Sequence, residues 1–317
     1  MTRNSAKQAQ ETNQLLATTE LVFRPAPCFS EKMDLRFFVI DAFAHQPYSG
    51  NPAAVVWVPK EQAMEPQAMQ LVAREFNLSE TAFVTPHEDG AFGLRWFTPT
   101  REVAICGHAT LATARALLEW ERWDATAPAL FKTRESGTLS CTHSPERRLE
   151  LSFPAIASRK TAVTESMEEA LGCPVNEARD SQHSLLLVLE SAKQVRECNP
   201  TLSQVASIHR RGVLITAAGN EEKPEHPAAD FVSRAFFPNY GIPEDPVCGS
   251  AHCLLTPFWA ERLSRTSLLA EQLSTRGGFL HVNCAQQGGK QRILLAGETA
   301  ITCKGELTAP IIAALTK

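Results

Sequence analysis

Two short segments of this sequence occur twice, in the same order, and this internal repeat constrains the fold more than any other feature. Residues 95–99 (RWFTP) are matched by residues 234–238 (RAFFP), at an offset of 139 residues (95 to 234). Residues 106–109 (CGHA) are matched by residues 248–251 (CGSA), at an offset of 142 residues (106 to 248). A three-residue insertion in the second copy accounts for the difference between these offsets. The repeat predicts that one structural unit is duplicated.

Each copy is predicted to contain a strand, a loop, a turn of small residues and a helix. The helix-compatible apolar stretches are residues 110–120 and 252–263. Gly107 and Gly249, just before them, let the backbone approach another group closely. The first turn of a helix also presents unpaired N–H groups, which suit an anion. We therefore expect the two turns to face each other and to hold a substrate carboxylate between the halves, where pockets are common.

Outside the repeat, the sequence divides into an extension and a folded region. Residues 1–33 are rich in Gln, Thr, Ser and Ala without sustained periodicity, which predicts a flexible extension. Strands are expected at 35–40 and 53–58, and an amphipathic helix at 65–76. Residues 77–84 then read as a turn that leads into a strand.

Composition and charge exclude several classes of function. The 317 residues are 44% hydrophobic and 21% charged, as in a globular protein with room for two domains. A net charge of −4 gives no basic field, so no nucleic-acid partner is expected. No apolar run suits a membrane helix or a signal peptide, so no membrane partner is expected either. Nine cysteines without a CxxC pair predict no metal centre and no disulfide framework, which favours a cytoplasmic location.

Five ordered motifs make the sequence similar to the phenazine-biosynthesis isomerase family (PhzF-like), from about residue 35 to the C-terminus. The motifs are FVIDAF with GNPAAVV (38–56), NLSETAFV (77–84), FTP (97–99), CGHAT (106–110) and EDPVCGSA (244–251).

This resemblance implies an α+β, diaminopimelate epimerase-like fold. Such a fold has two pseudo-symmetric halves, each a curled, mainly antiparallel sheet around a central helix, with the active site between them. The first half is expected at 34–154 plus 306–317, and the second at 155–305. The duplication seen in the repeat agrees with this architecture.

The resemblance also implies catalytic residues that need no cofactor. Glu80 matches the family's catalytic carboxylate, the general base and acid of a proton shift, and His108 and Asp245 match its supporting polar residues. Such chemistry needs an acid and a base near the reacting carbon and fixed donors for the developing charge. Burial in a closed cleft would raise the pKa of Glu80 into a useful range. Taken singly, each residue also has a structural explanation, as a turn carboxylate, a helix-start histidine or a match to a helix dipole.

Backbone groups and small or polar side chains near the two turns complete the predicted site. The predicted substrate-binding residues are Asn51, Gly107, Gly249, Ser250 and Ala251. Ser250 alone would also be explained as a helix cap.

Cys106 and Cys248 occupy equivalent positions in the two copies and form a rival proton-carrying pair. In the related diaminopimelate epimerases and proline racemases, a cysteine stands at each of these turns. One thiolate removes an α-proton there and the opposite thiol returns one to the other face. A helix N-terminus is expected to lower the pKa of such a thiol. Many phenazine-type members have threonine at the position of Cys248, so this residue is a departure toward the racemase pattern, although a small buried side chain is also wanted there.

The sequence therefore predicts a cofactor-independent isomerase acting on a small molecule with a carboxylate and an acidifiable C–H bond. Amino acids, hydroxyprolines and dihydroaromatic acids all fit that description. The resemblance implies a homodimer. Three alternatives stay open: a two-thiol amino-acid racemase or epimerase, a binding protein whose chemistry has lapsed, and a thiol redox sensor.

Overall fold

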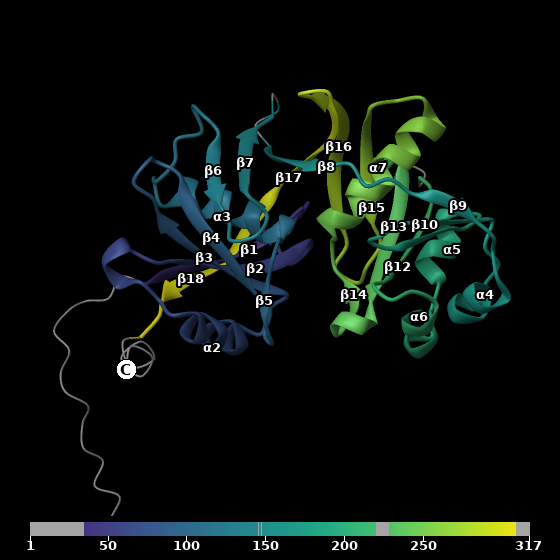
Figure 1. Ribbon diagram of the computed structural model, residues 1–317, viewed down its shortest axis with the longest axis horizontal. Helices are drawn as coiled ribbons and strands as arrows, with labels where there is room; N and C mark the ends of the chain where they lie inside the picture. Colours follow the sequence, from purple (N-terminus) through teal and green to yellow (C-terminus); the bar gives the residue numbers. More distant parts are fainter. Residues whose placement is uncertain (1–34, 145, 147, 220–227, 309–317) are drawn as a thin grey trace, which may run out of the picture. The chain divides into compact units, whose positions relative to one another are not determined.

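The computed structural model describes most of the chain (Figure 1). The described residues are 35–144, 146, 148–219 and 228–308. The predicted extension at 1–33 lies outside them, as do residues 309–317 of the C-terminal segment (306–317) that is predicted to join the first half. No helix within the described residues has both the length and the apolar character needed to span a membrane.

The strands form two sets that pair in the same way. In the first half the order is β18 (Thr299–Glu306), β1 (Arg36–Ala42), β2 (Asn51–Trp57), β3 (Glu80–Pro86), β4 (Phe92–Phe97), β6 (Ala129–Lys132), β7 (Thr138–His143) and β8 (Leu149–Pro154), with β5 (Glu102–Val103) also on β4. In the second half it is β9 (Arg159–Thr161), β10 (Glu177–Asp180), β11 (Leu185–Val188), β12 (Val213–Ala218), β13 (Phe231–Phe237), β15 (Ser267–Gln272), β16 (Gly278–Gln287) and β17 (Lys290–Gly297), with β14 (Ile242–Asp245) also on β13.

The directions of these pairings match as well. In the first half β2–β3 and β4–β6 are parallel, and in the second half the corresponding pairs β11–β12 and β13–β15 are parallel. All the other pairings within each half are antiparallel. The predicted duplication is therefore confirmed at the level of strand topology. An antiparallel pairing of β8 with β17 joins the two sets.

Each half contains one long helix that the strands enclose, α3 (Gly107–Glu119) or α7 (Gly249–Leu263). Both helices are buried along most of their length, and their apolar residues belong to one shared core. A helix that is apolar on nearly every side needs such an enclosure. The shorter helices lie elsewhere in the two halves: η1 (Lys60–Gln62), α2 (Pro66–Phe76), α4 (Glu165–Leu171), α5 (Ala192–Glu197), α6 (Leu202–Ile208) and η2 (Pro238–Tyr240).

The strand pairing bears on the predicted domain limits. The first half is predicted to end at residue 154, which is the last residue of β8. The return to the first half is predicted at residue 306, whereas β18 pairs with β1 from Thr299 onward. The limits of the two halves as domains stay a prediction.

An arginine–glutamate ion pair that the two sequence repeats do not include is also duplicated. Its two copies show where the three-residue insertion of the second copy lies. Arg95 on β4 donates to both carboxylate oxygens of Glu102, at 2.8 and 2.9 Å, and Arg234 on β13 donates to both oxygens of Glu244, at 2.7 and 2.9 Å. The arginines are offset by 139 residues (95 to 234) and the glutamates by 142 (102 to 244). The three extra residues therefore lie between Arg234 and Glu244, in the segment that contains η2.

Replacing Arg234 by alanine is expected to lower the free energy of unfolding by about 2–4 kcal/mol. The side chains of Arg234 and Glu244 are only 13% and 21% exposed, and Arg234 also donates to the carbonyl of Cys198. Arg95→Ala should cost less, about 1–2 kcal/mol, because Arg134 still contacts Glu102. Urea denaturation of both variants at neutral pH measures the two effects, and an equal or larger loss in Arg95→Ala would contradict this account.

Candidate active site

The N-termini of the two enclosed helices face each other. Cys106 precedes α3 and Cys248 precedes α7, each in an extended backbone conformation. A Cβ atom added to Gly107 would lie 3.9 Å from the Cα of Gly249. The structure thus brings together the two turns that the repeat singled out. Glycine at both positions keeps the space between the helix starts open.

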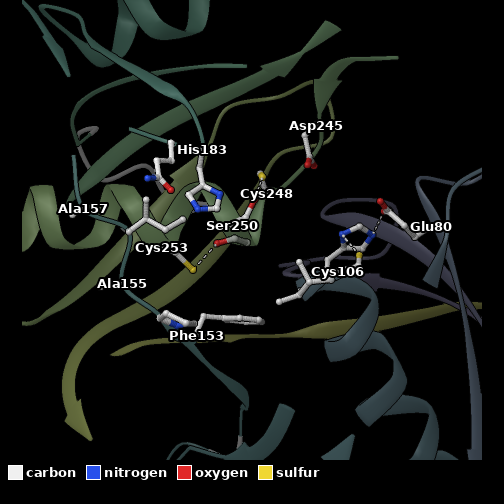
Figure 2. Close-up of a pocket in the computed structure, with 17 residues that line it drawn as sticks. Glu80, Cys106, Phe153, Ala155, Ala157, His183, Asp245, Cys248, Ser250 and Cys253 are labelled. Atoms are coloured by element: carbon white, nitrogen blue, oxygen red, sulfur yellow. Dashed lines mark hydrogen bonds and ion pairs between the residues drawn. The ribbon is translucent and has the colours of Figure 1, made fainter. Parts of the chain in front are cut away.

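A cavity of about 580 Å³ lies at these two turns (Figure 2). Its wall includes eight of the predicted site residues: Glu80, Cys106, Gly107, His108, Asp245, Cys248, Gly249 and Ser250. Asn51 and Ala251, also predicted to contact substrate, are buried and are not part of this wall.

Glu80 enters the cavity because of how the preceding helix ends. Helix α2 stops at Asn77, whose left-handed conformation (φ 49°) closes the helix and turns the chain. Strand β3 begins three residues later, at Glu80, and pairs in parallel with β2. The predicted turn followed by a strand is confirmed, and it delivers a carboxyl group to the end of the sheet.

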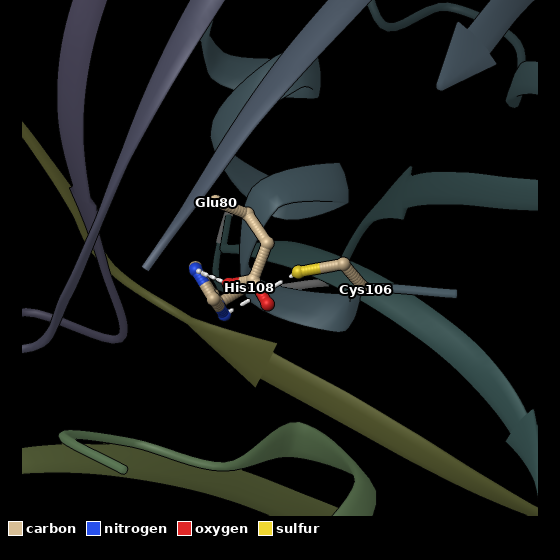
Figure 3. Close-up of side chains that lie close together, drawn as sticks. All are labelled: Glu80, Cys106 and His108. Atoms are coloured by element: carbon tan, nitrogen blue, oxygen red, sulfur yellow. Dashed lines mark hydrogen bonds and ion pairs between the residues drawn. The ribbon is translucent and has the colours of Figure 1, made fainter. Parts of the chain in front are cut away.

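His108 lies between Glu80 and Cys106 (Figure 3). Its Nε2 is 3.2 Å from Oε2 of Glu80, and its Nδ1 is 3.6 Å from Sγ of Cys106. The Nε2 contact is short enough for an ion pair but does not have hydrogen-bond geometry. Burial lowers the pKa of His108 to about 3, so the ring is neutral at pH 7. A neutral imidazole can relay a proton without adding a buried charge only if one ring nitrogen releases a proton as the other accepts one.

Asp245 is the second carboxyl group of the cavity, and Asn51 holds it. The side-chain amide of Asn51 donates to Oδ1 of Asp245 at 2.8 Å and to the carbonyl of Val247 at 3.0 Å. Asn51 is at the start of β2 in the first half, while Asp245 ends β14 in the second. Asn51 therefore positions a cavity residue of the other half.

The two carboxyl groups have raised and different pKa values. Burial, followed by the charge of Asp245, raises the pKa of Glu80 to about 8, although a hydrogen bond from the Cys106 thiol opposes the shift. Burial raises the pKa of Asp245 to about 6, against hydrogen bonds from the Cys248 thiol and the backbone N–H of Val247. At neutral pH, Glu80 is mostly protonated and Asp245 is mostly ionised. Carboxyl groups separated in this way can act as an acid and a base in one site.

The pKa values of the two cavity thiols are not lowered, although their positions at helix N-termini led us to expect this. The pKa of Cys106 is raised well above 9.0 by burial and by the charge of Glu80. The pKa of Cys248 is raised in the same way, by burial and by the charge of Asp245. The expected lowering is therefore wrong for this structure, because removal from water and a neighbouring carboxylate outweigh the helix dipole.

The cavity cysteines are consequently expected to resist alkylation. Cys106 and Cys248 are buried, whereas Cys303 on β18 is exposed. Treatment of the native, reduced protein with iodoacetamide at pH 8, followed by peptide mass spectrometry, should label Cys303 at least about 10-fold faster than either cavity thiol, because the thiolate is the reactive form. Labelling of Cys106 or Cys248 as fast as Cys303 would show that a thiolate forms readily in the cavity.

Glu80, Cys106 and His108 also have atoms of the kinds that bind metal ions. One donor atom each from Glu80, Cys106 and His108 lies within 4.8 Å of the others, the one such group within the described ranges. A metal bound there would require the Cys106 thiol to lose its proton, and the charge of the metal would itself favour that loss.

Other residues of the wall were not predicted from the sequence. They come from the end of β8, from the segment after it, from the β10–β11 turn and from α7: Phe153, Pro154, Ala155, Ile156, Ala157, Gln182, His183 and Cys253, together with Ile105 beside the first turn. The ring of Phe153 approaches within 3.6 Å of the Cβ position of Gly107. No local motif connects these residues with the repeat, because folding alone brings them to the cavity.

A duplicated α+β unit with a cavity between two facing helix N-termini defines the diaminopimelate epimerase-like class of fold. The crystal structure of a hydroxyproline epimerase from Agrobacterium vitis, solved with bound trans-4-hydroxy-L-proline, aligns over 86% of this chain and 92% of that one. Its TM-score is 0.53 and its sequence identity is 13%, a likeness of fold alone.

The comparisons at higher identity are with phenazine biosynthesis proteins. The family described as phenazine biosynthesis-like protein matches residues 40–305. An uncharacterized isomerase of Pseudomonas aeruginosa is 44% identical over 275 residues, which cover 87% of this chain and 99% of that protein. A crystal structure of a PhzF-family protein from Enterococcus faecalis is 39% identical with a TM-score of 0.79, and covers 87% of this chain and 100% of that one. The chain belongs to the phenazine biosynthesis-like (PhzF) family, and its predicted fold class is confirmed.

Proposed function

We propose that this protein is a cofactor-independent isomerase that moves a proton on a small carboxylate-bearing substrate, with Glu80 as the proton carrier. One observation carries the proposal. A buried carboxyl group, with its pKa raised to about 8, projects into a cavity that two opposed helix N-termini also reach. Relatives named as isomerases support the general class.

The helix starts account for substrate binding and for stabilisation of charge. The backbone N–H groups at Gly107 and Gly249 begin α3 and α7 and point toward the cavity end of each helix. A substrate carboxylate bound there would lie near the positive ends of two helix dipoles. Negative charge that develops next to the carboxylate during reaction would be held by the same fixed donors.

The proton transfer is balanced without a redox partner. Ionised Glu80 takes a proton from a carbon conjugated with the substrate carboxylate, and the electron pair of the broken C–H bond is delocalised toward that carboxylate. Protonated Glu80 then returns the proton to another carbon of the delocalised system, where a new C–H bond forms. His108, neutral and 3.2 Å from Glu80, can relay a proton between positions that the carboxyl group does not reach itself.

A two-thiol mechanism is the alternative within the same class. Sγ of Cys106 lies 3.6 Å from Nδ1 of His108, and Sγ of Cys248 lies 3.2 Å from Oγ of Ser250. Each thiol also interacts with a carboxyl group, Cys106 with Glu80 and Cys248 with Asp245. One of these carboxylates could accept the proton of its thiol as substrate binds. The thiolate would then remove the α-proton of an amino acid, and the opposite thiol would return a proton to the other face. The raised thiol pKa values make Glu80 the better carrier in the free protein. If Glu80→Gln remains active while Cys248→Ala is inactive, the thiol mechanism replaces the one proposed.

Proton NMR in D₂O tests the proposed function. The reduced protein is incubated with pooled amino acids, hydroxyprolines and cyclohexadiene carboxylic acids, and the loss of individual C–H signals is followed. The proposal is supported if deuterium replaces a C–H proton of one compound with the wild-type protein but not with Glu80→Gln. Complete absence of exchange across these substrate classes would favour a binding protein without catalytic activity.

A further inference from the structure

The turn between β10 and β11, residues 181–184, carries two side chains into the cavity that the proposed chemistry does not use. Gln182 and His183 both belong to the cavity wall, beside Ala155, Ile156 and Ala157. In Figure 2, His183 lies on the second-half side of the cavity, across from Glu80. Among the described residues that line this cavity there is no lysine or arginine. His183 is therefore a polar group at the end remote from the proton carrier.

The backbone of this turn is fixed although its tip is exposed. The hydroxyl of Ser181 accepts hydrogen bonds from the backbone N–H groups of His183, at 3.1 Å, and Ser184, at 2.9 Å. The same hydroxyl donates to the carbonyl of Ser184 at 2.8 Å, and the backbone N–H of Ser181 donates to that carbonyl at 3.2 Å. Ser181 and Ser184 are both buried. Four hydrogen bonds therefore fix the backbone positions from which Gln182 and His183 project.

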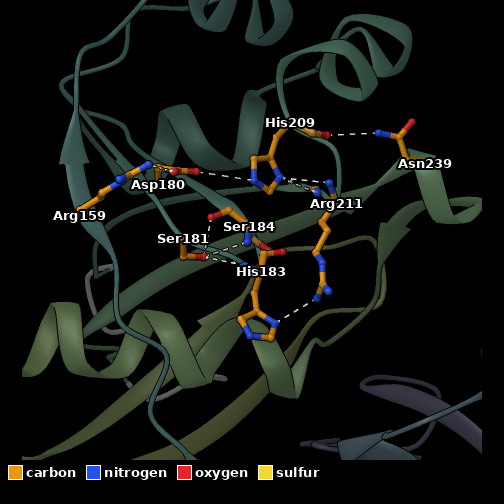
Figure 4. Close-up of polar contacts among 9 residues, drawn as sticks. Arg159, Asp180, Ser181, His183, Ser184, His209, Arg211 and Asn239 are labelled. Carbon is orange, nitrogen blue, oxygen red and sulfur yellow. Dashed lines mark hydrogen bonds and ion pairs between the residues drawn. The ribbon is translucent and has the colours of Figure 1, made fainter.

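A neighbouring arginine fixes the hydrogen-bonding state of His183 (Figure 4). Nη1 of Arg211 lies 3.2 Å from Nδ1 of His183. A guanidinium group can only donate, so Nδ1 must accept, and the ring must be neutral with its proton on Nε2. Burial and the charge of Arg211 both lower the pKa of His183, in agreement with a neutral ring.

Arg211 is in turn positioned by a second histidine. Nδ1 of His209 accepts the backbone N–H groups of Arg211, at 3.2 Å, and Gly212, at 3.1 Å. Nε2 of His209 lies 3.7 Å from Oδ1 of Asp180, the last residue of β10. The chain of contacts therefore begins and ends at the β10–β11 turn. Arg211 occupies Nδ1 of His183, which leaves the Nε2–H of this cavity-lining side chain as the donor that a ligand could use.

We propose that His183 is a specificity-determining residue whose Nε2–H donates to an acceptor oxygen on the substrate. The substrate would then carry two oxygen groups: a carboxylate at the helix N-termini, and a carboxylate, carbonyl or hydroxyl oxygen at the opposite end. The apolar wall formed by Phe153, Ile156 and Cys253 suits a hydrocarbon or ring between them. This inference deepens the proposed function and rests on substrate binding in the same cavity.

Binding of simple aromatic carboxylates tests the inference without requiring turnover. Benzoate presents one oxygen group, whereas isophthalate, terephthalate and meta-acetylbenzoate each add a second acceptor. Affinities are measured by ligand-detected NMR titration and calorimetry. At least one two-acceptor probe is expected to bind wild-type protein about 10-fold more tightly than benzoate, as one additional hydrogen bond allows.

His183→Ala should abolish that gain and leave benzoate affinity within about twofold of wild type. His183→Asn, which keeps an N–H donor, should retain part of the gain. The matched control is His87→Ala, because His87 is a half-exposed histidine outside this cavity that should have no effect. Circular dichroism checks that each variant is folded.

Three results would overturn the inference. The first is equal affinity, or equal absence of binding, for benzoate and every two-acceptor probe in wild type. The second is a gain that survives His183→Ala, and the third is an equal loss for benzoate and the two-acceptor probes in that variant. Because these are binding results, they are separate from the exchange experiment. A protein that selects two-acceptor probes but exchanges no C–H proton would retain this inference and lose the proposed catalysis.

Discussion

Glu80→Gln should lose C–H exchange activity by about 10²- to 10⁴-fold, the usual contribution of a positioned acid–base group. Glutamine keeps the size and much of the hydrogen-bonding capacity of the side chain but cannot carry a proton. The loss should appear in kcat, while substrate binding at the helix N-termini changes little. Exchange kinetics by NMR and substrate titration separate these two effects.

The same substitution should stabilise the fold at alkaline pH. The folded-state pKa of Glu80, about 8, is above its ordinary value of 4.5, so the folded protein favours the protonated form. The stability that this form provides is fully present below pH 4.5 and is lost as pH rises through about 8. The side chain of the Glu80→Gln variant stays neutral at every pH, so the stability difference should grow over this window to about 5 kcal/mol at most. Urea denaturation at acidic and alkaline pH measures it.

A matched control separates these effects from loss of a carboxylate in general. Glu88 is 81% exposed and pairs with Lys60 on the surface, so Glu88→Gln should change neither activity nor pH-dependent stability. Full activity in Glu80→Gln would remove Glu80 from the mechanism. Equal stability of wild type and Glu80→Gln at all pH values would show that the carboxyl group is not buried as described.

Asp245→Asn is expected to have the second largest effect, a loss of activity of about 10²-fold or more, together with a displaced pH profile. If ionised Glu80 starts the reaction, kcat/KM of wild type should rise with pH through about 8. The negative charge of Asp245 contributes to the raised pKa of Glu80, so its removal should lower that pKa. The rising limb of the profile should therefore move to lower pH in Asp245→Asn.

The displaced limb distinguishes an electrostatic role of Asp245 from a structural one. A purely structural carboxyl group would lower activity without moving the limb. The control is Asp89→Asn, which removes an exposed aspartate that pairs with Lys132 in the first half and lies outside the cavity. Rates measured from pH 5 to pH 10 in all three proteins give the comparison, and a limb that stays at the same pH would contradict the assigned coupling.

The raised pKa values of Cys106 and Cys248 argue against a role as thiolate bases in the free protein. Cys106 and Cys248 stand where a two-thiol racemase would place its acid and base, yet each lies beside a carboxyl group that raises its pKa. In this structure both are neutral thiols at pH 7, and they interact with Glu80 and Asp245. Such a thiol lowers the pKa of the carboxyl group that it contacts, and so acts against the effect of burial.

Residues close in sequence to the repeat were predictable because local chemistry determines their placement. The small residues at Gly107 and Gly249 predict helix starts that a ligand can approach, and duplication predicts that there are two of them. The strand after Asn77 predicts where Glu80 emerges. Each of these inferences depends on contacts within a few residues, or on a pattern that the chain repeats.

The sequence by itself thus determined a duplicated unit with two helix-start turns. Its resemblance to the PhzF-like family supplied the α+β class and the choice of Glu80 as the carboxyl group of the site. Only the tertiary structure decided the roles of Asn51 and His183 and the protonation states of the cavity. Asn51 contacts Asp245 across 194 positions of the chain, and His183 contacts Arg211 across 28. A pKa depends on how much water is excluded and on which charges lie nearby, and both follow from packing between distant segments. For that physical reason a raised pKa of Glu80 could be expected from burial, but the raised thiol pKa values and the raised pKa of Asp245 could not.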